Sequence, residues 1–250
     1  MRAIAHIAVT LISALAWNAW AFQSAPPASV ARAPYIPAPH GNTKIAIAWF
    51  SEVSGEVELA SAYGKDFQRA LDHTAIAQGN VIRTGMGRAE VELQDQSTIR
   101  VGPDSIIVFP RLELLPSGTK EAIVRGLRGT IYVSLIPNYI VNKKGNDFVF
   151  TFGQQQVYLQ SSGHVRLEIN DKEARLALLD GKGRVEGPFG AMELARKKTF
   201  TFDLTEPSQP GVEKKIKANL MDKWDTAAVA FHQDQIATPS RIARGFYNPP

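Results

Sequence analysis

Histidine, cysteine and acidic side chains are the ligands from which proteins build metal sites, so their spacing is informative. The 250 residues contain five histidines and no cysteine, and His6 lies in an apolar N-terminal run. A hydrolytic zinc helix needs two histidines one turn apart with a glutamate between them, and no such pair occurs. The lack of cysteine excludes disulfides, thiolate metal sites and a cysteine nucleophile. We therefore expect no metal site and no cofactor.

Two segments resemble catalytic or phosphate-binding loops only superficially. Residues 161–164 read Ser-Ser-Gly-His, which sets hydroxyls beside a possible base, but no strand-to-helix elbow follows them. Residues 181–187 are rich in glycine, yet they provide neither a helix N-terminus nor the Lys-Ser/Thr pair of a phosphate loop. We interpret the first segment as a turn and the second as a glycine-rich hairpin.

The carboxylates of Glu90 and Glu92 fall on one face of a predicted strand. A glycosidase can use two acids about 5–10 Å apart. Arg88 and Arg100 are close by, which favours solvated, paired charges instead. We therefore expect a protein without catalytic residues, and we expect replacement of Glu90, Glu92 or His164 by alanine to change the free energy of unfolding by less than about 1 kcal/mol each.

From residue 44 to about residue 205, short β-prone runs alternate with Gly, Asn, Asp and Pro, as in stacked or sandwiched strands. The clearest alternation predicts a hairpin over residues 88–101. Pairing Leu93 with Ile99 keeps the apolar residues of both strands on one face. The same register sets Glu92 opposite Arg100 on the other face.

A second hairpin is predicted around Asn170-Asp171, with Leu167 and Leu176 among its inward residues, and residues 180–183 indicate the next turn. The predicted fold class is all-β, with two packed sheets of short strands arranged as a β-sandwich or a short β-solenoid. A C-terminal amphipathic helix completes it.

That helix is predicted over residues 214–235, because apolar residues recur there at steps of three and four. Pro210-Gly211 precedes the pattern and Pro239 follows it, so these breakers bound the helix. The apolar stripe comprises Ile216, Leu220, Trp224, Ala227 or Ala228, and Phe231.

The N-terminus has the features of a secretory signal peptide. A short basic head precedes an apolar run that ends in Ala19-Trp20-Ala21, which predicts cleavage after residue 21. An uncleaved membrane anchor is the alternative. Residues 22–43 are rich in proline and form the predicted linker, residues 44–205 the β domain, and residues 206–250 the C-terminal helix and tail. We expect an exported protein, periplasmic or extracellular, with no membrane span after signal removal.

The charge balance argues against a nucleic-acid partner. Removal of residues 1–21 takes away Arg2 and no carboxylate, so the formal charge falls from +4 to +3. No long run of Lys and Arg marks a phosphate-tracking groove. The densest basic clusters, residues 196–198 and 214–217, are short and typical of a solvated face.

Several motifs occur in a fixed order over roughly residues 49–205. They are Val53-x-Gly55-x-Val57, Gly79-Asn80-x-Ile82-Arg83-Thr84-Gly85, Ala89-Glu90-Val91-x-Leu93, Ile99-Arg100-x-Gly102-Pro103-x-Ser105, Gly126-x-x-Gly129-Thr130-Ile131-Tyr132-Val133 and Leu179-x-Gly181-x-Gly183-x-Val185. This ordered set resembles the FecR domain, a periplasmic or secreted β module of bacterial sensors and exported proteins. The tail segment Met221-Asp222-Lys223-Trp224-Asp225 is similar to the Asp-x-Trp helix of stand-alone exported relatives.

The chain departs from this family at three places. Asp95-Gln96 stands where the family usually has Asp-Gly, so a left-handed residue in that turn costs on the order of 1 kcal/mol. Gly163-His164 replaces the usual Gly-Thr, and Ala228 replaces an arginine of the tail. The resemblance implies a sensing or interaction role.

We therefore expect a non-enzymatic FecR-like binding module, for protein–protein interaction or signal sensing in the bacterial cell envelope. The alternative is a carbohydrate- or peptidoglycan-binding protein or a degenerate hydrolase, suggested by the acids and by aromatic residues that either line a groove or fill the core. These aromatics are Trp49, Phe50, Tyr132, Tyr139, Phe148, Phe150 and Phe152. Same-face spacing of the last three favours the core.

The helix stripe lies outside the predicted β domain, so it needs cover from that domain or from another chain. Trp224, Leu220 and Phe231 are the candidate contacts for a partner, expected to be an envelope protein. Docking of the helix on its own β domain is the favoured alternative. The sequence specifies neither the partner's identity nor the oligomeric state.

Overall fold

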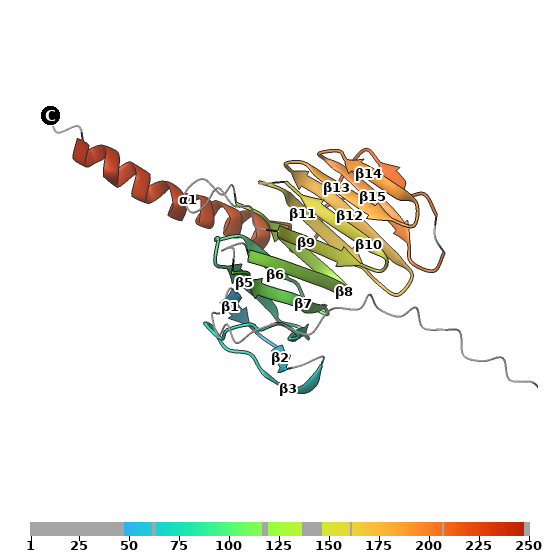
Figure 1. Cartoon of the computed structure of the whole chain (residues 1–250), viewed down its shortest axis with the longest axis horizontal. Helices are drawn as coiled ribbons and strands as arrows, with labels where there is room; N and C mark the ends of the chain where they lie inside the picture. The colour runs from blue at the N-terminus through green and yellow to red at the C-terminus, as the bar shows by residue number, and fades with distance from the viewer. Residues whose placement is uncertain are drawn as a thin grey trace, which may run out of the picture. The chain divides into compact units, whose positions relative to one another are not determined.

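The computed structural model describes residues 48–61, 64–116, 120–136, 147–160, 162–206 and 208–247, and Figure 1 labels their elements. Over these residues the chain forms sixteen β-strands followed by one α-helix. The predicted all-β fold with a C-terminal helix is confirmed. The expected signal peptide and linker lie outside the described residues, as does Tyr139.

One ladder of strands, here called sheet A, is antiparallel throughout and has the order β1-β5-β6-β8-β11-β12-β15-β16. Its strands are β1 (Ala48–Ser54), β5 (Arg88–Leu93), β6 (Thr98–Val101), β8 (Lys120–Ser134), β11 (His164–Ile169), β12 (Glu173–Asp180), β15 (Lys198–Asp203) and β16 (Gly211–Glu213).

The second ladder, sheet B, has the order β3-β2-β4-β7-β8-β9-β10-β13-β14. Its pairs are antiparallel except for β8 and β9. Its strands besides β8 are β2 (Val57–Ser61), β3 (Lys65–Arg69), β4 (Val81–Thr84), β7 (Ile106–Leu114), β9 (Asp147–Phe152), β10 (Gln155–Leu159), β13 (Gly183–Gly187) and β14 (Gly190–Leu194).

Strand β8 belongs to both sheets. Its residues up to Arg128 pair with β7 and β9 of sheet B, and those from Gly129 onward pair with β6 and β11 of sheet A. Gly129 has a φ of 94°, and a β-carbon there would overlap with the Ser105 side chain. Ser105 Oγ accepts a hydrogen bond from the Thr130 N–H at 3.0 Å. A glycine is therefore required where the strand passes from one sheet to the other.

The inward residues of the two sheets form one hydrophobic core. Phe50, Ile99 and Leu167 of sheet A and Ile82 and Phe150 of sheet B are fully buried within it. Two ladders around one core correspond to the sandwich arrangement rather than to a solenoid. Phe148 and Phe152 also lie in this core, as their spacing predicted.

The register predicted for the β5–β6 hairpin is wrong by two residues. Val91, not Leu93, lies opposite Ile99, and Glu90 lies opposite Arg100. The turn causes this difference, because Gln96 adopts the left-handed conformation, with a φ of 68°. The Leu93 N–H then donates a hydrogen bond to the Ser97 carbonyl at 2.8 Å, and this bond fixes the register.

The β11–β12 hairpin forms as expected, with Leu167 opposite Leu176. The Asn170 side chain accepts the N–H groups of Lys172 and Glu173 at 2.9 Å each, which closes the turn. Residues 181–187, in contrast, are not a hairpin. β12 lies in sheet A and β13 in sheet B, so the segment carries the chain between sheets.

Helix α1 spans Asp222–Tyr247 and so begins eight residues after the predicted start. Asn219 Oδ1 accepts the Met221 N–H at 2.8 Å, and Asp222 Oδ2 accepts the Asn219 N–H at 2.7 Å. This reciprocal pair is a capping box, which explains why the helix starts here. The helix also continues through Pro239, which lacks one backbone donor but does not end it.

No helix among the described residues combines the length and the apolar character needed to cross a membrane.

Candidate functional site

A row of polar residues crosses the outer face of sheet A, here called the polar row. Glu90, Arg100, Tyr132 and Arg166 lie opposite one another on β5, β6, β8 and β11. Each alternates along its strand with core residues, so all four point away from the core. The fold thus aligns two arginines, an acid and a phenol on one surface.

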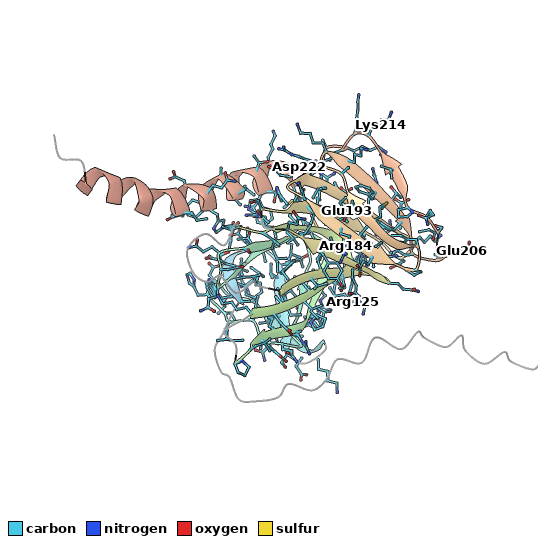
Figure 2. The ribbon with its side chains drawn as sticks, turned by 45° about the horizontal axis from the view of Figure 1, so that its top comes forward. Arg125, Arg184, Glu193, Glu206, Lys214 and Asp222 are labelled. Atoms are coloured by element: carbon cyan, nitrogen blue, oxygen red, sulfur yellow. The ribbon has the colours of Figure 1, made fainter. Side chains whose placement is uncertain are left out.

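All four residues of the polar row are buried. The side chains of Arg100 and Arg166 are 0% and 2% exposed. Strand residues on an outer face are normally solvated, and buried arginine is rare unless it is paired. The contacts below show that α1 and the segment before it supply the cover. Figure 2 shows Asp222 at the start of this helix.

Arg100 joins the sheet to the helix. Its Nε lies 2.7 Å from Glu90 Oε2, and its Nη1 lies 3.1 Å from Asp225 Oδ1. Asp225 is itself buried, and its other carboxylate oxygen lies 3.0 Å from His164 Nε2. One carboxylate from the sheet and one from the helix therefore share the charge of a single buried guanidinium.

Arg166 makes the matching contact one helical turn earlier. Its Nη1 lies 2.6 Å from Asp222 Oδ1, and its Nη2 donates to the Lys217 carbonyl at 2.6 Å. The Tyr132 hydroxyl donates to the same Asp222 oxygen at 2.8 Å. On the sheet, Glu168 is farther away, at 3.6 Å from Arg166 Nε. The helix segment is thus the principal partner of Arg166.

Further contacts hold the helix along β5 and β1. His232 Nε2 lies 2.8 Å from Glu90 Oε1, two turns beyond Asp225. Trp224 Nε1 donates to Glu52 Oε2 at 3.2 Å, and Arg88 stacks over the Trp224 ring at 4.8 Å from its centre. The docking of α1 on sheet A is therefore predominantly ionic.

The expectation that Glu90, Glu92 and His164 are solvated is wrong for two of them. Glu90 is 5% exposed and contacts Arg100, His232 and the Ser51 hydroxyl. His164 is partly buried against Asp225, and Glu92 is intermediate. The Glu90→Ala and His164→Ala variants should therefore lose more folding stability than a variant at an exposed strand position, and the loss should be largest at Glu90.

The three candidate partner contacts have different surroundings. Trp224 lies against sheet A, whereas Leu220 is 99% and Phe231 60% exposed. The stripe predicted from Ile216 to Phe231 is interrupted because Ile216 and Leu220 precede the helix. Contact with a partner through these residues stays a prediction.

Burial and charge act against each other on the carboxyl groups of this site. For Glu90, burial raises the pKa, but the His232 hydrogen bond and the Arg100 charge outweigh it and hold the pKa below its ordinary 4.5. For Asp222, burial likewise raises the pKa, and the Asn219 N–H and Arg166 outweigh it. The pKa of Glu92 is raised, chiefly by burial. Burial and Asp222 also raise the pKa of Tyr132.

These pKa shifts predict loss of stability in acid. A carboxyl whose pKa is lower in the folded state stabilises the fold above its unfolded pKa, and this contribution is lost as the pH falls through the lowered value. Glu90 and Asp222 therefore predict that the free energy of unfolding falls progressively below pH 4.5. Urea titrations at several pH values measure this.

Glu92 provides the control for the acid prediction, because its raised pKa has the opposite sign. Glu90→Gln should flatten the fall in the free energy of unfolding below pH 4.5. Glu92→Gln should instead remove a gain in stability that occurs above pH 4.5, as the pH falls through the raised pKa of Glu92. If neither substitution changes the pH dependence of the free energy of unfolding, Glu90 and Glu92 are not the groups that cause it.

The carboxylates of the site are held by arginine, histidine or backbone donors, and no cluster of three or more potential metal ligands occurs within the described ranges. The sequence prediction did not include Arg166, Asp222 or Asp225 among the site residues, and it named Tyr132 only as an aromatic residue that lines a groove or fills the core. Two signals pointed to them: polar residues alternating with core positions in two strands, and the capping box at the helix start.

Comparisons with known proteins give only distant structural similarity. No family model and no curated protein matches the chain. Two crystal structures described as a "putative anti-sigma factor" from Parabacteroides distasonis are similar, each at 14% identity, with TM-scores of 0.43 and 0.41. They cover 54% and 53% of this chain, which in turn spans 59% and 58% of theirs. Similarity at this level does not assign a function.

Proposed function

We propose that this chain is an exported, non-enzymatic binding module of the FecR type, which contacts a protein of the bacterial cell envelope in the periplasm or outside the cell. The proposal is supported mainly by what the charged residues of the polar row do. Arg100 and Arg166 on sheet A bind carboxylates of α1, so these charges join two surfaces instead of forming a catalytic group. The ordered motifs and the apolar N-terminus support the family and the export.

The alternative of a glycan-binding protein is less well supported. Glu90 is buried and paired, and Tyr132, Phe148, Phe150 and Phe152 are buried as well. These residues therefore offer no open surface to a sugar, which requires accessible acids and aromatic faces.

Phe231 provides the test for a protein partner, because its side chain is 60% exposed although α1 lies against sheet A. A photoreactive phenylalanine analogue at position 231 should crosslink the chain to one envelope protein in the native bacterium. Mass spectrometry of the product identifies that protein, and it should also show a mature chain that begins at Phe22.

The same analogue at Leu71 is the matched control, since this residue is 63% exposed in the β domain. Crosslinking from position 231 alone is the expected result. Equal products from both positions, or none from either, would refute a specific protein partner for this surface.

A further inference from the structure

We propose that the polar row is a receptor for the acidic start of a helix, and that α1 fills it as an internal ligand which an acidic helix of a partner protein can displace. The proposal rests on the proposed function and specifies the chemistry of the partner. The ligand is a first helical turn with carboxylates at positions i and i+3, as Asp222 and Asp225 are in α1.

The sheet alone leaves its arginines short of acceptors. Arg100 has one carboxylate partner on the sheet, Glu90, and Arg166 has only the distant Glu168 at 3.6 Å. Their other acceptors come from α1 and the residues before it: Asp222, Asp225 and the Lys217 carbonyl. Without α1, sheet A would therefore present two cationic groups that need carboxylates.

The spacing of the receptor suits a helix start. Arg100 and Arg166 stand on β6 and β11, with β8 between them, so their strands are roughly 10 Å apart. Residues i and i+3 of a helix lie on the same side, with β-carbons about 5–6 Å apart. The arginine side chains are long enough to bridge the difference between the strand separation and the β-carbon separation. The Tyr132 hydroxyl, on the strand between them, also donates to Asp222.

A donor within the receptor is unused. Arg100 Nη2 is buried and has no hydrogen-bond partner among the described residues, although the whole side chain is 0% exposed. A ligand that brings one more acceptor to this atom would gain a charged hydrogen bond that α1 does not make. This gives a displacing helix an advantage over the internal one.

Helix α1 is held in a way that permits exchange. Its contacts are mainly ionic. The apolar side chains of Phe231 and of Leu220, just before the helix, contribute little because they are 60% and 99% exposed. Buried ion pairs add little net stability, since desolvation offsets their attraction. Residues 214–221, which connect β16 to α1, belong to no strand or helix, so release of α1 breaks no ladder hydrogen bond.

The test uses the full chain and a labelled peptide of residues 219–236 as the probe. In the full-length Asp222→Asn/Asp225→Asn variant the internal ligand is weakened, so the peptide should bind and raise the fluorescence anisotropy. Binding to the wild-type chain should be at least about tenfold weaker, because α1 competes. Should the double variant fail to fold by circular dichroism, the single Asp222→Asn variant replaces it.

Two matched peptides separate the contribution of the two aspartates to binding from that of the other peptide residues. A peptide with asparagine in place of both aspartates should lose binding by about tenfold or more. A peptide that keeps Asn219, Asp222 and Asp225 and has alanine elsewhere should still bind. Tyr132→Phe in the protein should weaken binding, since it removes one donor to the Asp222 carboxylate.

No binding of the native-sequence peptide, or equal binding of its asparagine form, would overturn the receptor. In that case an envelope protein crosslinked at Phe231 would leave the proposed function standing. Conversely, peptide binding without any crosslinked envelope protein would support the receptor and refute the proposed function.

Discussion

Replacement of Arg100 by methionine should lower the free energy of unfolding by about 3–5 kcal/mol, the cost of breaking a buried ion pair from one side. The substitution leaves Glu90 and Asp225 buried next to each other without their shared cation. Methionine keeps much of the side-chain volume, so the loss reports charge rather than a cavity. Urea denaturation followed by circular dichroism at neutral pH measures it.

Arg83→Met is the matched control, because it removes an arginine–glutamate pair on the surface. The Arg83 and Glu58 side chains are 46% and 41% exposed, and water screens such a pair, so the expected cost is below about 1 kcal/mol. Equal losses in the two variants would show that the Arg100 contacts are not the buried network described above.

Gly129→Ala should destabilise the protein by about 2–5 kcal/mol, the combined cost of a left-handed residue and an overpacked contact. The glycine has a φ of 94° at the point where β8 passes between the sheets, and its added β-carbon would overlap with Ser105. Since Ser105 Oγ accepts the Thr130 N–H, the clash also disturbs a hydrogen bond. Thermal and urea unfolding both report the loss.

Gly190→Ala separates the two costs in this prediction. Gly190 has a nearly identical φ of 98°, but nothing lies within 4 Å of its β-carbon position. Only the backbone strain remains there, about 1–2 kcal/mol. If the two variants lose the same stability, close packing at the β8 crossing is not what requires glycine.

The strands were predictable because their alternation records which face is buried. Leu167 and Leu176 pair as expected, and the Asn170 turn between them has its ordinary chemistry. The β5–β6 register was not predictable from that alternation, because a shift of two residues keeps every side chain on its face. Gln96, in the left-handed conformation without being glycine, decided it.

The site was predictable in part. The sequence indicated that acids and arginines share the outer face of the hairpin, including Glu90 and Arg100. Their burial depends on Asp225, which is 125 residues away from Arg100 in the chain, and no local pattern encodes such a contact. The prediction followed the apolar stripe of the helix, whereas its acidic first turn makes the contact.

A double-mutant cycle between Arg100 and Asp225 tests the central claim, that carboxylates of α1 hold the helix on buried arginines of sheet A. The cycle compares Arg100→Met, Asp225→Asn and the double variant by urea denaturation. We expect the double variant to lose less stability than the two single losses together, by about 1–3 kcal/mol. Additive losses, within about 0.5 kcal/mol, would show that Arg100 and Asp225 do not interact and that this ion pair does not hold α1 on sheet A.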